Sequence, residues 1–391
     1  MSLYQTAPAI QRRQTPTNCA ALLHLLETSS HLASLVKVIE LGAHLGTQWI
    51  FSDSHLPSIL DLIINIQEFH FPASVFGIID QASVSPIGRA FMSVFRRSSL
   101  KSIAFSNQRP VPDQTIRNLL LCVGPGVDQM SYNGVSLTLR KCSNPEVPIP
   151  VDVLTLRMHE DILGYEYLLI LASPNTFCLT HLTNLHLICR NLHELGAHRE
   201  FLRTTDLSLR HLKFDYTANS PDEAASASPD TFLNLMRLSL LKSLDIHCDL
   251  SSLQLHLSNH FLHLLSQSLQ TLPFASPIDF ICLRLHRFRG PTSRPAQGDV
   301  FDPSPWVAIA HCFDRPDLAS LREISFKVDI PDNNTPDNSP MFALRTQVKN
   351  TLETALKRDV AIVPPGWVHL SIVKDPYLGS DKLPAISSLS L

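Results

Sequence analysis

One pattern of apolar and polar positions recurs along the chain: an apolar residue, two spacers, an apolar residue, one spacer and a final apolar residue. It occurs eleven times between residues 36 and 367, at a mean interval of about 33 residues, which is typical of repeat proteins. The segments are VKVIEL from Val36, IQEFHF from Ile66, LKSIAF from Leu100, VDQMSY from Val127, VDVLTL from Val151, LTNLHL from Leu182, LRHLKF from Leu209, LKSLDI from Leu241, IDFICL from Ile278, LREISF from Leu321 and WVHLSI from Trp367.

Within the segments, the third and fifth positions are mostly polar, whereas the fourth and sixth are apolar. Alternate side chains of a β-strand point to opposite faces of the sheet, so this alternation predicts strands with one buried and one polar face. In LRHLKF, for example, we expect Leu212 and Phe214 in the core and His211 and Lys213 on the polar face. By the same argument Leu185, Leu244 and Ile324 are expected to be buried.

Stretches with helical spacing precede most of these strands. They are LPSILDLIIN, GRAFMSVFRRSS, LHELGAHREFLRTTD, PDTFLNLMRLSL, HLSNHFLHLLSQSLQTL and PWVAIAHCF. The fourth opens with Pro229, Asp230 and Thr231, which is typical of a helix start. Because a helical crossover returns the chain in the same direction, we predict parallel pairing of successive strands. Pro- and Ser-rich insertions all follow a strand, as expected for loops that gather on one edge.

Composition narrows the choice of function. A net charge of −3 gives no basis for binding nucleic acid or an anionic membrane. Eight cysteines without a CxxC motif indicate a reducing compartment, so we expect the cytoplasm or the nucleus. No apolar run approaches the length of a membrane span. We expect no cofactor, since no phosphate-binding loop, dinucleotide fingerprint or metalloprotease motif is present.

Segments such as CAALLHLLETSSHLASLVKVIEL, LPSILDLIINIQEFHF and LTHLTNLHL resemble the irregular leucine-rich repeats of fungal, mushroom-type F-box proteins. The resemblance covers about residues 19 to 373. It implies a curved solenoid whose strands line the concave side, and a role as substrate receptor of a cullin-type ubiquitin ligase. The family's F-box opens with an LPxE-like helix that binds the ligase's linker subunit. Here only LPSIL at Leu56 approaches that motif, between two predicted strands, so the resemblance extends to the repeats and leaves contact with the linker subunit unsupported.

We therefore predict an α/β, leucine-rich-repeat-like solenoid of about eleven units over residues 19–374, with a disordered arm at 1–18 and a loose tail at 375–391. A (β/α)₈ barrel is the alternative fold, and an enzyme of unknown reaction is its corresponding function. Eleven strands exceed the eight of a barrel, and barrel strands are covered on both faces and are apolar throughout. A degenerate or truncated gene product without function is a third possibility.

The predicted function is protein–protein interaction through the concave face, without catalytic residues. Eight polar residues on the predicted strands are the candidates for contact with a protein partner: Asn184, His186, His211, Lys213, Ser243, Asp245, Glu323 and Lys327. Two other groups carry possible chemistry. His256, His260 and His263 share a helix face and have metal-ligand spacing, but a solvated face is favoured and no metal is predicted. RLHRFRGPTSR, which includes Arg284, is interpreted as a solvated loop.

Overall fold

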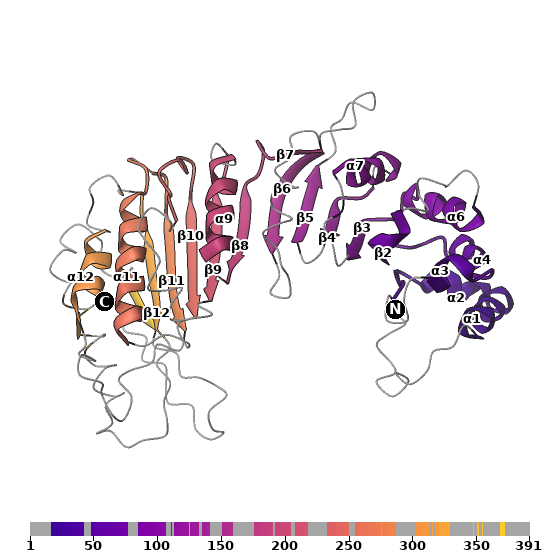
Figure 1. The fold of residues 1–391 in the computed structure, drawn as a ribbon, viewed down its shortest axis with the longest axis horizontal. Coiled ribbons are helices and arrows are strands. Elements are labelled where there is room, and N and C mark those ends of the chain that lie inside the picture. The colour runs from indigo at the N-terminus through magenta and orange to yellow at the C-terminus, as the bar shows by residue number, and fades with distance from the viewer. Residues whose placement is uncertain are drawn as a thin grey trace, which may run out of the picture. The chain divides into compact units, whose positions relative to one another are not determined.

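A computed structural model describes the chain with gaps. The residues described are 17–42, 48–76, 85–106, 111, 113–124, 126–132, 135–140, 151–158, 176–190, 192–204, 208–217, 233–249, 255–274, 276–286, 302–312, 315, 318, 320–328, 347, 350–351, 354 and 368–371. The chain divides into two compact units, Met1–His181 and Leu182–Leu391, each built of α-helices and β-strands (Figure 1). Most of the predicted arm (1–18) and all of the predicted tail (375–391) lie outside the described residues, and the domain limits stay a prediction.

The first unit contains strands β1 (Val38–Glu40), β2 (Glu68–Pro72), β3 (Ser102–Ser106), β4 (Gln129–Tyr132), β5 (Val135–Arg140), β6 (Val151–Met158) and β7 (Phe177–Cys178). Its helices are α1 (Thr17–Thr28), α2 (Ser30–Leu35), α3 (Gln48–Ser52), α4 (Leu56–Leu62), α6 (Pro86–Phe95) and α7 (Asp113–Cys122), with a 3₁₀ turn at Ala73–Val75. Strands β1 to β4 pair in parallel, whereas β5 is antiparallel to both β4 and β6. The prediction of parallel pairing throughout was therefore wrong at β5, because a short link replaces the helical crossover there.

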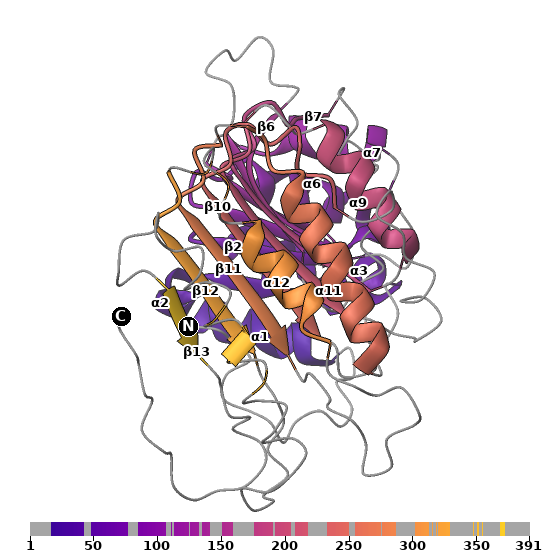
Figure 2. The same cartoon turned by 90° about the vertical axis from the view of Figure 1, so that its left-hand side faces the viewer.

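The second unit contains strands β8 (Asn184–Cys189), β9 (His211–Thr217), β10 (Ser243–Asp249), β11 (Phe280–His286), β12 (Glu323–Val328) and β13 (Val368–Ser371). These strands are paired in parallel in chain order. Helices α9 (Leu192–Thr204), α11 (Leu255–Gln270) and α12 (Ser304–His311) lie on one face of the strands (Figure 2). The sheet is thus mostly parallel and not closed, which confirms the mixed α/β class, and each of the eleven predicted segments contains a strand.

The buried face of the second unit follows the predicted alternation. Leu185, Leu212, Leu244 and Ile281 are register partners on adjacent strands, and all four are buried. In the first unit several inward positions carry larger rings: Phe69 at the fourth position and Phe71, Phe105 and Tyr132 at the sixth are buried and form an aromatic cluster. Burial of Leu185, Leu212 and Leu244 is confirmed, whereas the side chain of Ile324 lies outside the described set.

Six of the eleven segments are joined to the next one through a shared carbonyl near the start of the strand. The carbonyl of Lys242, the second residue of its segment, accepts the backbone N–H groups of both Asp279 and Phe280 at 2.8 and 3.3 Å. The carbonyls at the same position of five other segments each accept a pair of N–H groups from the next segment; they belong to Lys37, Gln67, Lys101, Thr183 and Arg210. The motif's spacers therefore have equivalent roles in successive strands of each unit, which is the property expected of structural repeats.

Two arginines, each just after one helix, bind the C-terminal end of the preceding helix in the chain: Arg97 follows α6 and binds α4, and Arg315 follows α12 and binds α11. In the first unit, Arg97 donates to the carbonyls of Leu60 and Ile63 at the end of α4. In the second unit, Arg315 donates to the carbonyls of Gln270 and Leu272 at the end of α11, each at 3.1 Å. The last carbonyls of a helix have no partner within the helix, so these side chains satisfy acceptors that would otherwise need water.

Two local predictions were wrong. The segment PDTFLNLMRLSL is not a helix over its described part: residues 233–242 form successive turns, in which Leu238 donates to Leu235 and Leu241 donates to Leu238. In β6 the register shifts opposite Thr138 and Leu139, so Val153 is buried and Leu154 is partly exposed. An extra residue in one strand turns the following side chains to the other face.

Candidate functional site

Polar side chains on β8 to β11 form two rows on the face opposite the buried leucines. His186, Lys213 and Asp245 are register partners and form the first row. Two residues further along the strands, Asp215, His247 and Arg284 are register partners and form the second. Period-two alternation with the buried residues fixes the direction of these side chains. The strands thus bring together charged groups that are far apart in the sequence, and we call these six residues the polar cluster.

Asp215 lies at the centre of the polar cluster. Its Oδ2 atom accepts hydrogen bonds from Nε2 of His186 at 2.7 Å and from Nζ of Lys213 at 3.0 Å. Nδ1 of His247 lies 3.7 Å from the other oxygen, Oδ1. The carboxylate therefore joins three strands, since its neighbours come from β8, β9 and β10.

The environment of Asp215 favours its ionised form. Burial by itself would raise the pKa of this carboxyl group, since its side chain is only 17% exposed. Hydrogen bonds from His186 and Lys213, together with their charges, outweigh that effect and lower the pKa below its ordinary value. Asp215 is therefore a carboxylate at neutral pH, held by donors on one of its two oxygens.

A second ion pair lies next to it. Arg284 Nη2 is 3.6 Å from Oδ2 of Asp245, and the arginine side chain is 46% exposed. A hydrogen bond with Cys282 is the main reason that the pKa of Arg284 is raised; burial opposes the shift and the charge of Asp245 adds to it. The guanidinium stays protonated and leaves part of its surface open to a ligand.

Both carboxylates keep one oxygen without a donor. Oδ1 of Asp215 and Oδ1 of Asp245 are buried and accept no hydrogen bond from any part of the chain that the structure describes. A carboxylate has about four acceptor positions, and a buried oxygen without a donor costs about 1–3 kcal/mol. The members of the polar cluster that another molecule can reach are the more exposed side chains, Lys213, His247 and Arg284.

The structure brings together part of the predicted set. His186, Lys213 and Asp245 belong to the polar cluster, whereas Asn184, His211 and Ser243 are aligned in a row at the start of their strands. Of these last three, His211 is exposed and the other two are partly buried. Glu323 and Lys327 lie in β12, but their side chains are outside the described residues.

Sequence reasoning missed half of the polar cluster. Asp215 and His247 each stand one position after the six-residue motif, where the alternation continues and a longer motif would have included them. Arg284 was assigned to a solvated loop, which is wrong because it lies within β11. The fifth positions of two segments, Cys282 and Ser325, are buried although their place in the motif predicts exposure.

The histidine helix gives no support for a metal site. His260 is partly buried and His263 is exposed on α11, where Nε2 of His263 lies 3.0 Å from Nε2 of Gln267. The side chain of His256 is outside the described residues.

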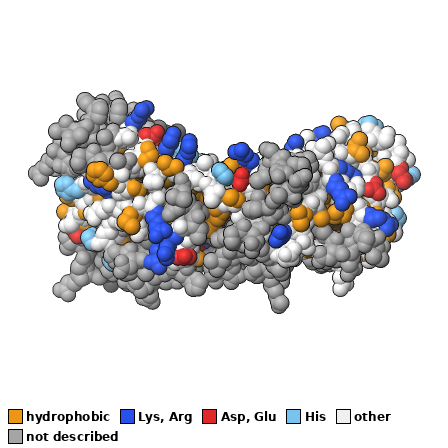
Figure 3. All heavy atoms as spheres, turned by 90° about the horizontal axis from the view of Figure 1, so that it is seen from above, with side chains coloured by type: hydrophobic (Ala, Val, Ile, Leu, Met, Phe, Trp, Pro, Cys, Tyr) orange, Lys and Arg blue, Asp and Glu red, His pale blue; other side chains and the backbone are white. Residues whose placement is uncertain are grey.

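Figure 3 shows one face of the molecule, on which Lys and Arg side chains lie beside acidic and histidine side chains, so charges of both signs occur there.

No family model matches the sequence, and no curated protein matches it. Among the helices that the structure describes, none is long and apolar enough to cross a membrane. The polar cluster is therefore interpreted from its own geometry, together with the resemblance of the repeats.

Proposed function

We propose that the chain is a protein-binding, leucine-rich-repeat-like solenoid, and that the polar cluster is part of its binding surface. The observation that carries the proposal is the pair of accessible cations on neighbouring strands: Lys213 and Arg284, with side chains 39% and 46% exposed, are ion-paired with Asp215 and Asp245. Both cations lie on the face of these strands opposite the buried Leu185, Leu212 and Leu244.

The partner fitted to this surface is a polypeptide segment that presents acceptor groups. Its carbonyl or carboxylate groups would bind the exposed parts of Lys213 and Arg284. Hydrogen bonds to charged groups are among the strongest in proteins, and they fix the orientation of a partner. Because both signs of charge are present, a partner of mixed charge is favoured over a polyanion such as nucleic acid.

The resemblance of the repeats to fungal F-box proteins supports a more specific role. In that role the bound protein is a substrate, and the chain acts as a receptor related to those of cullin-type ubiquitin ligases. The strand order runs from β1 to β13 without closing on itself, which supports the solenoid over a barrel, because a barrel needs its first and last strands to pair.

Affinity capture from a fungal extract with the full-length chain tests the function. We compare the wild type with Lys213→Gln and Arg284→Gln, which remove a charge and keep most of the side chain. Arg203→Gln is the matched control, since Arg203 is an exposed residue of α9, on the helical side, paired with Glu200 at 3.0 Å.

The proposal requires a protein that the wild type and Arg203→Gln retain and that both polar-cluster variants lose by tenfold or more. If every retained protein binds all four chains equally, the polar cluster is not the binding surface. Recovery of the ligase linker subunit with the wild type would support the receptor role, whereas a specific partner without it indicates a binding module that works alone.

A further inference from the structure

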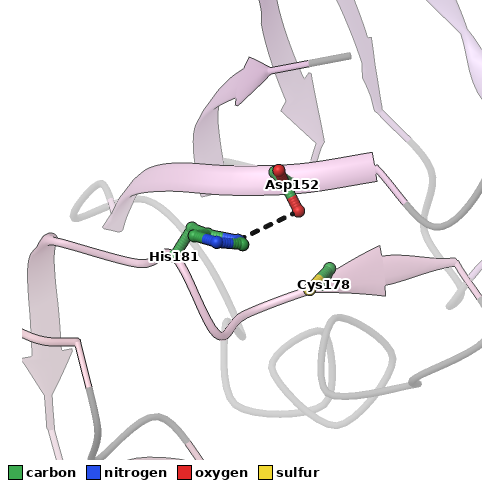
Figure 4. Close-up of side chains that lie close together, drawn as sticks. All are labelled: Asp152, Cys178 and His181. Atoms are coloured by element: carbon green, nitrogen blue, oxygen red, sulfur yellow. Dashed lines mark ion pairs between the residues drawn. The ribbon is translucent and has the colours of Figure 1, made fainter. Parts of the chain in front are cut away.

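A cluster of three metal-ligating side chains lies in the first unit, away from the histidine helix considered above. Asp152 on β6 and Cys178 on β7 are register partners in a parallel pair, so their side chains belong to one face. The chain then turns, and Nδ1 of His181 comes to 3.2 Å from Oδ1 of Asp152 (Figure 4). One oxygen, one sulfur and one nitrogen atom of these residues all lie within 4.8 Å of one another.

These three ligand types, and their spacing, fit a zinc ion. Zinc binds Cys sulfur at about 2.3 Å, and His nitrogen and carboxylate oxygen at about 2.0–2.2 Å, in tetrahedral geometry. Two ligand atoms of such a site are then about 3.3–3.8 Å apart. The separation of Asp152 and His181 is already close to this range. The wider separations need to close by about 1 Å, which side-chain rotation can supply.

The exposure of the residues suits a site that closes on a metal. Asp152 is held in the sheet with a side chain 13% exposed, while that of His181 is 57% exposed and has room to rotate. Thr180 contacts both Cys178 and His181: its Oγ1 lies 2.9 Å from Sγ of Cys178 and 3.3 Å from Nδ1 of His181. An ion pair between Asp152 and His181 would involve only two of the three groups, whereas zinc coordination also uses the thiol of Cys178.

We propose that Asp152, Cys178 and His181 bind Zn²⁺, with a fourth position open to water or to a ligand. Three protein ligands and one open position are the arrangement of zinc sites that exchange a ligand. The proposal concerns the first unit and does not depend on the protein-binding surface of the second.

Metal titration of the metal-free, full-length protein tests this site, with Zn²⁺ alone in competition with a chromogenic chelator. Co²⁺ is then used as a spectroscopic substitute, because a bound thiolate gives cobalt a charge-transfer absorption band. The variants are Cys178→Ser and His181→Gln. Cys122→Ser is the control, since Cys122 is a cysteine at the end of α7 in the same unit.

We expect one Zn²⁺ per chain in the wild type and in Cys122→Ser, and affinity at least about tenfold lower in the two site variants. The cobalt band should disappear in Cys178→Ser. Zinc should also raise the melting temperature of the wild type and leave that of Cys178→Ser unchanged, because a ligand stabilises the state that binds it. Equal zinc affinity of the wild type and Cys178→Ser, or a cobalt band that survives in Cys178→Ser, would overturn the proposal.

Discussion

His198 should make the stability of the second unit depend on pH between about 4 and 6.5. It lies in α9 with its ring fully buried, edge-on to Phe214 at 6.4 Å between ring centres. Neither ring nitrogen has a hydrogen-bond partner among the described residues. Burial disfavours the charged imidazolium and lowers the pKa of His198 from 6.5 to about 4.

The sign of the effect follows from proton binding. Below pH 6.5 the unfolded chain takes up a proton on this imidazole, whereas the folded chain does so only near pH 4. The unfolded state therefore gains stability as the pH falls through this window, and the effect levels off below pH 4. With these values the linkage relation lowers the free energy of unfolding by about 2 kcal/mol between pH 7 and pH 5.

Urea unfolding at pH 7, 6 and 5, followed by circular dichroism, measures this term. Other groups also titrate, so the wild type is compared with His198→Leu, in which the contribution of the imidazole is absent. His263→Leu, on an exposed face of α11, is the control and should retain the wild-type pH dependence. If His198→Leu loses stability between pH 7 and pH 5 as steeply as the wild type, the buried neutral imidazole is not the cause.

Four further substitutions test the packing. Leu244→Ala removes a fully buried side chain of β10 and should lower the free energy of unfolding by about 2–5 kcal/mol in urea titration; an unchanged midpoint would place Leu244 outside the core. Gly126→Ala would put a Cβ atom 2.8 Å from the carbonyl oxygen of Ser98 and should cost about 1–3 kcal/mol, whereas Gly196→Ala, with open space around it, should stabilise α9 by about 0.5–1 kcal/mol; equal effects would contradict the close approach. Arg97→Met leaves two carbonyls near the end of α4 without their donor, so hydrogen exchange of that helix should accelerate, and unaltered exchange would show that the arginine does not hold it.

Strands were the part of the fold that the sequence predicted best. Alternation of apolar and polar residues is a local property, and it marked the buried faces of β8, β9 and β10 correctly. The extra strand β5 was not predicted, although VSLTLR alternates apolar and polar residues. Asn133 and Gly134 lie between β4 and β5 in the sequence, and an Asn-Gly pair between alternating segments is a strong hairpin signal that could have predicted the antiparallel pairing.

The false helix at 229–240 has a physical explanation. Leu233, Leu235, Leu238 and Leu241 are all buried, and successive single turns place them on one side as well as a helix would. The Thr271 hydroxyl also accepts the N–H of Leu235 at 2.8 Å, a bond from a distant segment that no local pattern contains. Tertiary contacts of this kind override local spacing.

The candidate site was predictable only in part, for a related reason. Polarity at the fifth positions identified His186, Lys213 and Asp245. The central role of Asp215 depends on the register between β8, β9 and β10, which decides that His186 and Lys213 both reach its Oδ2. The cluster of Asp152, Cys178 and His181 depends in the same way on the pairing of β6 with β7. Register between strands is a property of the folded chain.

The shared carbonyls at the strand starts have a consequence for how such a surface can change. Leu209 and Leu241 are closer in the sequence than Ile278 and Leu321, and yet β9 to β12 remain aligned residue by residue. Because alignment is transmitted at the strand starts, connecting segments can lengthen or shorten without displacing any outward side chain. A single outward substitution then alters one position of a two-dimensional array and leaves its neighbours in place. A surface of this kind can acquire a new partner one residue at a time while its core stays the same.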